Sequence, residues 1–162
     1  MIDGYLLDTN HVRYWFDNSA GVLARIATLP KETPLRVSAI TLGEIEYGHK
    51  AESPSAPTEI QLKFSLFVRS KLPAVLPVTT STTTYYGDIR SKLFTRFSPK
   101  QKQKRRRPEQ LLDPVTGKEL GIQENDVWIA AQALEHDLIL VTNDPMHRIR
   151  EVVLDLRVEN WQ

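Results

Sequence analysis

The sequence ENDVWIAAQA at residues 124–133, followed by LILVTND at 138–144, decides the fold of this chain. The first stretch predicts a helix, because apolar residues recur at helical spacing through positions 129, 130, 133 and 134. Glu124 or Asn125 is expected to cap it, and Asp126 stands in its first turn near the positive end of the helix dipole. The second stretch predicts a buried strand that ends at Asn143 and Asp144. One helix start and one strand end therefore each carry an aspartate.

The same alternation of strand and helix runs through the rest of the chain. Further strands are expected at 5–7, 35–40, 75–78 and 153–158, and helices after residue 10 and at 21–29, 42–49, 59–72 and 83–97. Pro77 suggests that the strand at 75–78 lies at a sheet edge. Thr41 is expected to cap the helix at 42–49, which places Glu44 in the first turn. The alternation predicts an α/β three-layer sandwich with a mostly parallel central sheet.

The composition is that of a single globular domain over residues 1–162. An apolar run of about 18 residues, which a membrane span requires, does not occur, and the first residues do not resemble a signal peptide. Cysteine is absent, which excludes disulfides and thiolate metal sites and fits a cytoplasmic protein. Neither a membrane partner nor a secreted scaffold is expected.

Positive charge is concentrated in the segment 98–121, whose net charge is +4 although that of the whole chain is +1. The segment has no clear periodicity and contains Pro108 and Pro114, so we expect a long loop or a hairpin-like insertion. Its densest part consists of Lys104, Arg105, Arg106 and Arg107. These side chains are candidate contacts for a polyanion, and the alternative is a solvated loop.

Four acidic residues are expected at one edge of the sheet. In parallel α/β sheets, sites lie beyond the carboxyl ends of the strands. Asp8 and Asp144 follow strands directly, and Glu44 and Asp126 lie near helix starts that face the same edge. Carboxylates that stand this close repel one another unless a cation joins them. Hard oxygen ligands suit Mg²⁺ or Mn²⁺, and the reaction that follows is metal-assisted hydrolysis of a phosphodiester.

Each acid also has a simpler structural interpretation. Asp8 suits a helix cap, and Asp144 suits a loop before Pro145. Complementing the helix dipole is a sufficient role for Glu44, and the same alternative applies to Asp126. Two further acids compete with these assignments: Glu46 is expected to be solvated, and Glu124 to be a cap or an outer group.

Four motifs, LLDTN at 6–10, GEIEYG at 43–48, ENDVWIAA at 124–131 and VTND at 141–144, resemble those of PIN-domain ribonucleases. They are most similar to those of the VapC-type toxins of bacterial toxin–antitoxin pairs. The resemblance implies an Mg²⁺- or Mn²⁺-dependent endoribonuclease that acts on RNA, forms a homodimer and is inhibited by a cognate antitoxin. It implies catalytic roles for Asp8, Glu44, Asp126 and Asp144, with Asp8 and Asp126 on the metal. Thr9, Thr142 and Asn143 would support these groups, and the basic residues 104–107 would contact RNA.

Two other functions remain open from the sequence. A phosphatase of the haloacid dehalogenase kind would use Asp8 as a nucleophile, but that family requires a second aspartate where this chain has Asn10. A catalytically inactive RNA- or protein-binding module on the same fold is the other alternative, although an unused acid cluster would be destabilising. The basic segment is longer than the resemblance leads one to expect, which leaves the choice of substrate open.

Overall fold

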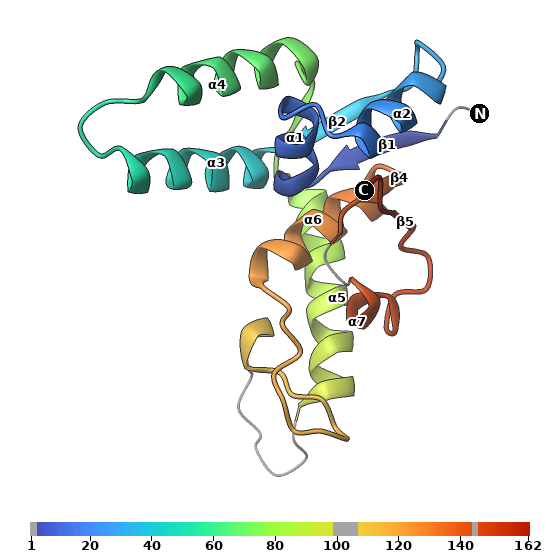
Figure 1. Ribbon diagram of the computed structural model, residues 1–162. Coiled ribbons are helices and arrows are strands. Elements are labelled where there is room, and N and C mark those ends of the chain that lie inside the picture. Colours follow the sequence, from blue (N-terminus) through green and yellow to red (C-terminus); the bar gives the residue numbers. More distant parts are fainter. Residues whose placement is uncertain (1–2, 99–106, 144–145) are drawn as a thin grey trace.

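The structure is a computed structural model that describes residues 3–98, 107–143 and 146–162 (Figure 1). The strands of this part are β1 (Gly4–Leu7), β2 (Leu35–Ser38), β3 (Val75–Leu76), β4 (Leu138–Val141) and β5 (Val158–Glu159). The helices are α1 (Thr9–Phe16), α2 (Ala20–Thr28), α3 (Ala39–Glu52), α4 (Glu59–Lys71), α5 (Thr80–Phe97), α6 (Glu124–Glu135) and α7 (His147–Arg150). A short 3-10 helix, η1, covers Pro108–Gln110. None of these helices is long and apolar enough to cross a membrane.

The strands form one sheet in the order β3-β2-β1-β4-β5, and every pairing in it is parallel. The chain therefore builds the sheet outward from β1 in one direction and later outward from β4 in the other. Between these two strands, where Leu7 pairs with Val141, the direction of winding reverses. Such a switch point leaves a crevice at the carboxyl ends of the two central strands. The predicted parallel sheet is confirmed, as is the edge position of β3.

Helices cover both faces of the sheet, which confirms the predicted three layers. Successive side chains of a strand point to opposite faces. Leu6 and Leu140 are buried in a core shared with α5 and α6, whereas Tyr5, Leu7 and Val141 are buried in a core shared with α1, α2 and α4. Both faces of the central strands are thus apolar, which is typical of a parallel sheet. Polar side chains that could take part in chemistry are therefore expected at the edge of the sheet.

The start of α3 differs from the expectation. Ser38, the last residue of β2, accepts a hydrogen bond from the backbone N–H of Ile40 and so caps the helix. The strand ends at 38 instead of 40, and Thr41 is buried inside the helix instead of capping it. Glu44 is consequently in the second turn. A cap that is also a strand residue leaves no intervening loop, and the sequence pattern does not reveal this.

Other predicted boundaries also shift because caps lie earlier than expected. Thr79 caps α5 in a reciprocal arrangement with Thr82, so the helix starts at Thr80. Gln123, not Glu124 or Asn125, occupies the cap position of α6.

The last strand was predicted at 153–158, but β5 covers only 158–159. Val153 and Leu156 are buried in turns that pack under α7, and this burial produced the apolar pattern.

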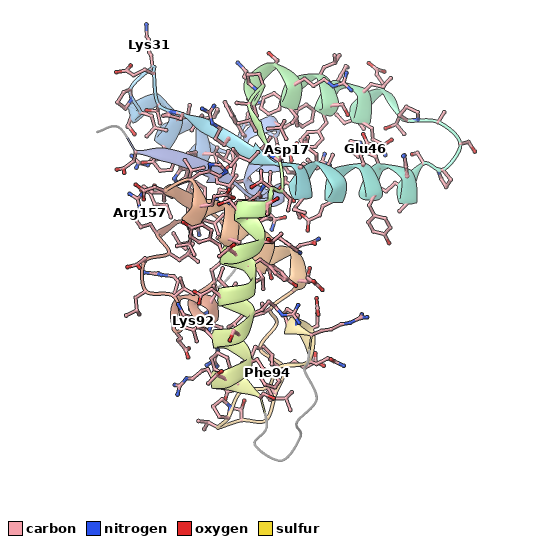
Figure 2. The ribbon with its side chains drawn as sticks, turned by 180° about the vertical axis from the view of Figure 1, so that it is seen from behind. Asp17, Lys31, Glu46, Lys92, Phe94 and Arg157 are labelled. Atoms are coloured by element: carbon pink, nitrogen blue, oxygen red, sulfur yellow. The ribbon has the colours of Figure 1, made fainter. Side chains whose placement is uncertain are left out.

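Two parts project from the layered body (Figure 1). Helices α3 and α4 run side by side as an arm. At the far end of α5, beyond Lys92 and Phe94, the segment 107–123 lies against the helix (Figure 2). Backbone hydrogen bonds pair Leu111 with Leu120 and Asp113 with Lys118, so this segment is a hairpin, as expected for the described part of the insertion. Gly117 has a φ of +69° in its turn, a conformation that favours glycine.

Candidate functional site

A cleft of about 250 Å³ opens at the carboxyl edge of the sheet, at the switch point between β1 and β4. It brings together residues that are far apart in the sequence. The lining comprises Asp8, Thr9, Asn10, Glu44, Gln123, Asp126, Ile129, Thr142 and Met146. Three of the four predicted acids thus lie on one cleft. The fourth, Asp144, lies outside the described residues.

Asp8 is held at the end of β1 by contacts on both sides. Its backbone N–H donates to the carbonyl of Val141 at 3.0 Å, which continues the pairing of β1 with β4 by one residue. Its Oδ1 accepts the backbone N–H of His11 at 2.8 Å and caps α1. The residue is only 8% exposed. Asp8 is therefore a helix cap and a cleft residue at once, so the two interpretations of the sequence are compatible.

Glu44 joins two helix starts across the cleft. One carboxylate oxygen accepts from the Thr9 hydroxyl, and the other accepts from Asn125 Nδ2 at 3.0 Å. These contacts connect α3 with α1 and α6. Glu46, the competitor for the role of Glu44, lies exposed on α3 and is 3.9 Å from Lys50 Nζ. The geometry thus directs Glu44 into the cleft and Glu46 away from it.

Asp126 is the third residue of α6 and reaches back over its first turn. Its Oδ2 accepts the backbone N–H of Gln123 at 2.7 Å, which satisfies one of the free donors of the helix start. The adjacent Glu124 turns elsewhere: it accepts the Tyr86 hydroxyl at 2.5 Å and lies 3.5 Å from Arg90. Burial, and then this carboxylate, raise the pKa of Tyr86. Trp128 stacks on the same tyrosine, with ring centroids 3.7 Å apart.

The predicted supporting residues separate into two groups. Thr9 and Thr142 line the cleft, and Thr142 is 2% exposed at the end of β4. Asn143 is exposed, and its amide donates to the Tyr14 hydroxyl at 3.0 Å while its oxygen accepts from Asn10 at 3.2 Å. Its side chain therefore ties the end of β4 to α1. A role in holding the loop fits these contacts better than a direct contact with a ligand.

The roles of two residues of the site were not predicted from the sequence. No role was assigned to His11, yet this residue is fully buried and its Nδ1 lies 3.0 Å from Asp8 Oδ1. Asn125 was considered only as a helix cap, yet it orients Glu44. For His11 a signal was available, because a residue three positions after a helix cap faces that cap.

The oxygen donors of the cleft fit a hard divalent cation. Mg²⁺ takes one or two carboxylates directly and keeps water on its remaining positions. Asp8 and Asp126 supply two such carboxylates on one cleft. Within the three described ranges, no group of three acidic, histidine or cysteine side chains is close enough to form a full ligand set. The two carboxylates match the number that Mg²⁺ takes directly.

The basic residues of the insertion are only partly described. Lys104, Arg105 and Arg106 lie outside the described residues, and Arg107, which precedes η1, is exposed. The hairpin that follows is attached to the body through Glu109, whose carboxylate accepts the backbone N–H of Glu124 at 2.7 Å. The insertion is thus connected to the first turn of α6, which also carries Asp126.

Fold and cleft together define a doubly wound α/β protein with a carboxylate-lined cleft at its switch point. The PIN domain family model matches residues 5–152, and the chain belongs to this family. The resemblance in the four motifs is thereby confirmed.

Known relatives agree with this assignment. The chain is 28% identical to ribonuclease VapC2 of Rickettsia felis over 160 residues, which is 97% of each chain. Its fold is similar to a chain in the crystal structure of VapBC2 from Rickettsia felis bound to a promoter DNA fragment, with a TM-score of 0.71, 24% identity and full coverage of both chains. It is also similar to a chain of VapBC-1 from nontypeable Haemophilus influenzae, with a TM-score of 0.69 and 22% identity over 99% and 98% of the two chains.

Proposed function

We propose that this protein is a divalent-metal-dependent endoribonuclease that acts as the toxin of a toxin–antitoxin pair in the cytoplasm. The observation that carries the proposal is the cleft at the switch point, which Asp8, Glu44 and Asp126 line. Membership of the PIN domain family and the 28% identity to a protein named ribonuclease VapC2 support it. The substrate class is RNA, and the reaction is hydrolysis of its phosphodiester bonds.

Asp8 and Asp126 would hold Mg²⁺ or Mn²⁺. When bound, the cation would supply charge stabilisation at the phosphate and a lowered pKa for a water molecule. Glu44, which Thr9 and Asn125 orient, would add negative charge to the site and organise its water. Thr142 would hold a water or a phosphate oxygen from the floor of the cleft, and Asp144 would complete the set of acids.

The insertion would bind the RNA backbone through Lys104, Arg105, Arg106 and Arg107. Contacts of this kind supply affinity and strong salt dependence, but they carry little sequence information. The link between Glu109 and the start of α6 supports the idea, because it connects the insertion with the helix that carries Asp126.

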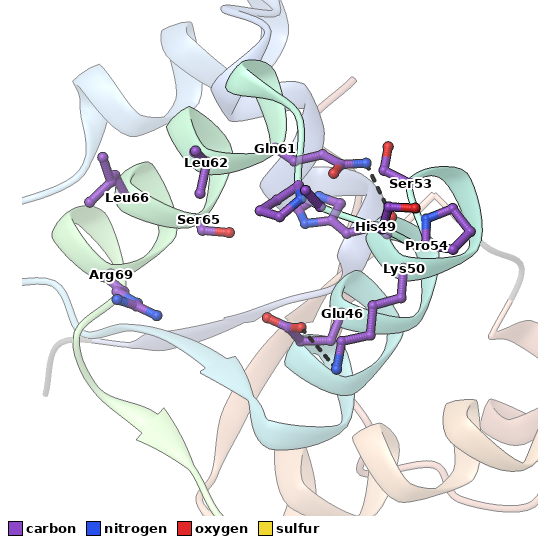
Figure 3. A pocket seen from close by; sticks show the side chains of 13 residues that line it. Glu46, His49, Lys50, Ser53, Pro54, Gln61, Leu62, Ser65, Leu66 and Arg69 are labelled. Atoms are coloured by element: carbon purple, nitrogen blue, oxygen red, sulfur yellow. Dashed lines mark hydrogen bonds and ion pairs between the residues drawn. The ribbon is translucent and has the colours of Figure 1, made fainter.

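The arm of α3 and α4 would bind the antitoxin. A cavity of about 540 Å³ lies between the two helices, with Leu62, Leu66 and Arg69 on one wall and Glu46 and Lys50 on the other (Figure 3). A second cavity of about 330 Å³ continues toward Leu72 and Pro73. Leu62 and Leu66 are 52% and 65% exposed, and an apolar surface of this kind favours a protein partner. The partner would be an amphipathic segment of the antitoxin, and a homodimer of the toxin would present two such arms.

The proposal is tested by incubating purified protein with total bacterial RNA in Mg²⁺ or Mn²⁺, with and without a chelator, beside Asp126→Asn. Discrete products that require metal and disappear in the variant are expected. Binding of RNA without cleavage by folded protein would favour the inactive module. A phosphoenzyme trapped at Asp8 would favour the phosphatase. Expression without the antitoxin is expected to be toxic to a bacterial host, and harmless expression of folded protein would contradict the toxin assignment.

A further inference from the structure

His11 lies between the candidate metal site and the C-terminal end of the chain. It sits in the first turn of α1 and is fully buried. On one side its Nδ1 lies 3.0 Å from Asp8 Oδ1. On the other side its Nε2 lies 3.2 Å from the backbone nitrogen of Trp161. A buried ring whose two nitrogens contact a carboxylate and a backbone amide has a fixed orientation.

The two partners determine which nitrogen carries the proton. The Asp8 carboxylate can only accept, so Nδ1 is the donor to it. The backbone N–H of Trp161 can only donate, so Nε2 is the acceptor. Asn160 Oδ1, which accepts the backbone N–H of Gln162, also lies 3.2 Å from Nε2. The backbone N–H of Trp161 at Nε2 therefore favours the tautomer whose proton is on Nδ1.

The C-terminal segment that supplies this donor is held firmly. Trp161 is 4% exposed, packs edge-on against Tyr5 and donates its indole N–H to Glu159 at 2.8 Å. Gly21 allows the Trp161 backbone to approach α2, because a Cβ at position 21 would lie 2.4 Å from the Trp161 carbonyl oxygen. This close contact explains a glycine that stands inside a helix without needing an unusual φ. The donor on Nε2 is thus fixed by the packing of the segment.

We propose that His11 is a positioning residue for Asp8 and that the C-terminal segment around Trp161 sets its orientation. Two donors, the backbone N–H and Nδ1–H of His11, converge on Oδ1 of Asp8. They fix the plane of the carboxylate, so that it faces the cleft in one orientation. The inference rests on the proposed function, because it concerns the carboxylate that is proposed to bind the metal. Groups that orient a metal ligand typically change metal affinity about 10–100-fold when they are removed.

Three substitutions at His11 separate its two contacts. An asparagine amide occupies the place of Nδ1, so His11→Asn keeps the donor to Asp8 and loses the acceptor for Trp161. A glutamine amide occupies the place of Nε2, so His11→Gln keeps the contact with Trp161 and loses the donor. His11→Leu loses both contacts. Mn²⁺ affinity, measured from the electron paramagnetic resonance signal of free Mn²⁺, is expected to fall about tenfold or more in His11→Gln and His11→Leu. His11→Asn is expected to restore most of it.

The C-terminal segment is tested at a distance by Gly21→Ala, which displaces Trp161 without touching Asp8. Mn²⁺ affinity is expected to fall in this variant too, by less than in His11→Leu. Leu93→Ala is the matched control, because Leu93 is fully buried in the core on the other face of the sheet. This control is expected to lose stability and to keep its affinity for Mn²⁺. Thermal unfolding of each variant separates an effect on folding from an effect on the metal.

The outcomes distinguish the inference from the proposed function. If the wild-type protein binds no Mn²⁺, both fail. If it binds Mn²⁺ and cleaves RNA while His11→Leu binds as tightly as the wild type, only the inference fails. Nitrogen-15 shifts of the His11 ring give a test that needs no metal: a protonated Nδ1 and an unprotonated Nε2 are expected. The reverse pattern would overturn the assignment.

Discussion

The acid-lined cleft and the basic insertion are built in different ways. The cleft is assembled by the sheet: it lies where β1 and β4 meet, and its hydrogen bonds join residues far apart in the sequence, such as Glu44 and Asn125, which are 81 positions apart. The hairpin of the insertion is assembled locally, by backbone hydrogen bonds between residues 111 and 120. It is anchored by buried Leu111 and by an ion pair from Asp113 to Arg148.

This difference indicates that the cleft carries the chemistry and that the insertion can vary. Moving a cleft residue would require a change in the central strands, and both faces of these strands are buried. Leu111 and Asp113 attach the hairpin to the body, whereas its exposed residues can change at little cost to the fold. We therefore expect substitutions in the cleft to affect the reaction itself and substitutions in the insertion to affect binding of RNA.

Loss of a metal-binding acid is expected to have the largest effect. Asp8→Asn or Asp126→Asn should lower the rate of RNA cleavage about a hundredfold or more, since a bound metal contributes several kcal/mol and each 1.36 kcal/mol is a factor of ten. Single-turnover cleavage at saturating Mn²⁺ measures this effect. Asp88→Asn is the control, because Asp88 is an exposed acid on α5 paired with Lys92. Similar rates in all of these proteins would mean that the cleft is not the active site.

Glu44→Gln is expected to have a smaller effect on the same rate. Glutamine can keep the contacts with Thr9 and Asn125, so the variant removes charge and preserves most of the geometry. A loss of about tenfold is expected, equivalent to about 1.4 kcal/mol. Thr9→Val tests the geometry instead, since it removes the hydroxyl and keeps the charge. An unchanged rate in Glu44→Gln together with a large loss in Thr9→Val would show that Glu44 acts only by holding α1 in place.

Neutralising the insertion should weaken RNA binding and leave cleavage at saturating RNA nearly unchanged. Each phosphate contact contributes about 0.7 to the slope of log affinity against log salt for a single strand. Arg107→Ala should reduce the slope by that amount if Arg107 contacts RNA, and replacing residues 104–107 together should reduce it further. Lys31→Ala, in the turn before β2 and far from the insertion in Figure 2, is the matched control. An equal slope in both single variants would show that Arg107 does not contact the RNA.

Acidification should loosen the hairpin with the smallest effect on the reaction. Backbone N–H groups of Thr116 and Val115, together with Arg148, lower the pKa of Asp113 from 3.8 to about 2. Because the folded pKa is depressed, the charged carboxylate stabilises the hairpin above about pH 4, and this contribution is lost as the pH falls toward 2. Amide protection of residues 111–120 should decrease over this range. In Asp113→Asn the dependence should disappear, and its persistence would assign the effect to another acid.

The sequence predicted the elements of the cleft better than those of the insertion, for a physical reason. A strand buried in a parallel sheet is apolar along its length and is followed by polar residues. This pattern in the sequence predicted β1 and β4, together with Asp8 and Thr142 at their ends. Parallel winding then placed the acids on one edge. Helix caps were harder to predict: Ser38 belongs to β2 and also caps α3, and at the start of α6 the Asp126 side chain accepts the backbone N–H of Gln123. The role of His11 depends on Trp161, 150 residues away, and short-range patterns do not contain such contacts.

The most direct test of the account is a crystal of this protein soaked in Mn²⁺ and measured near the manganese absorption edge. An anomalous peak is expected in the cleft, within bonding distance of the carboxylates of Asp8 and Asp126. The peak should be absent in crystals of Asp126→Asn. A well-ordered wild-type cleft without a peak at saturating Mn²⁺, or a peak bound elsewhere on the chain, would contradict the claim that these carboxylates form a metal site.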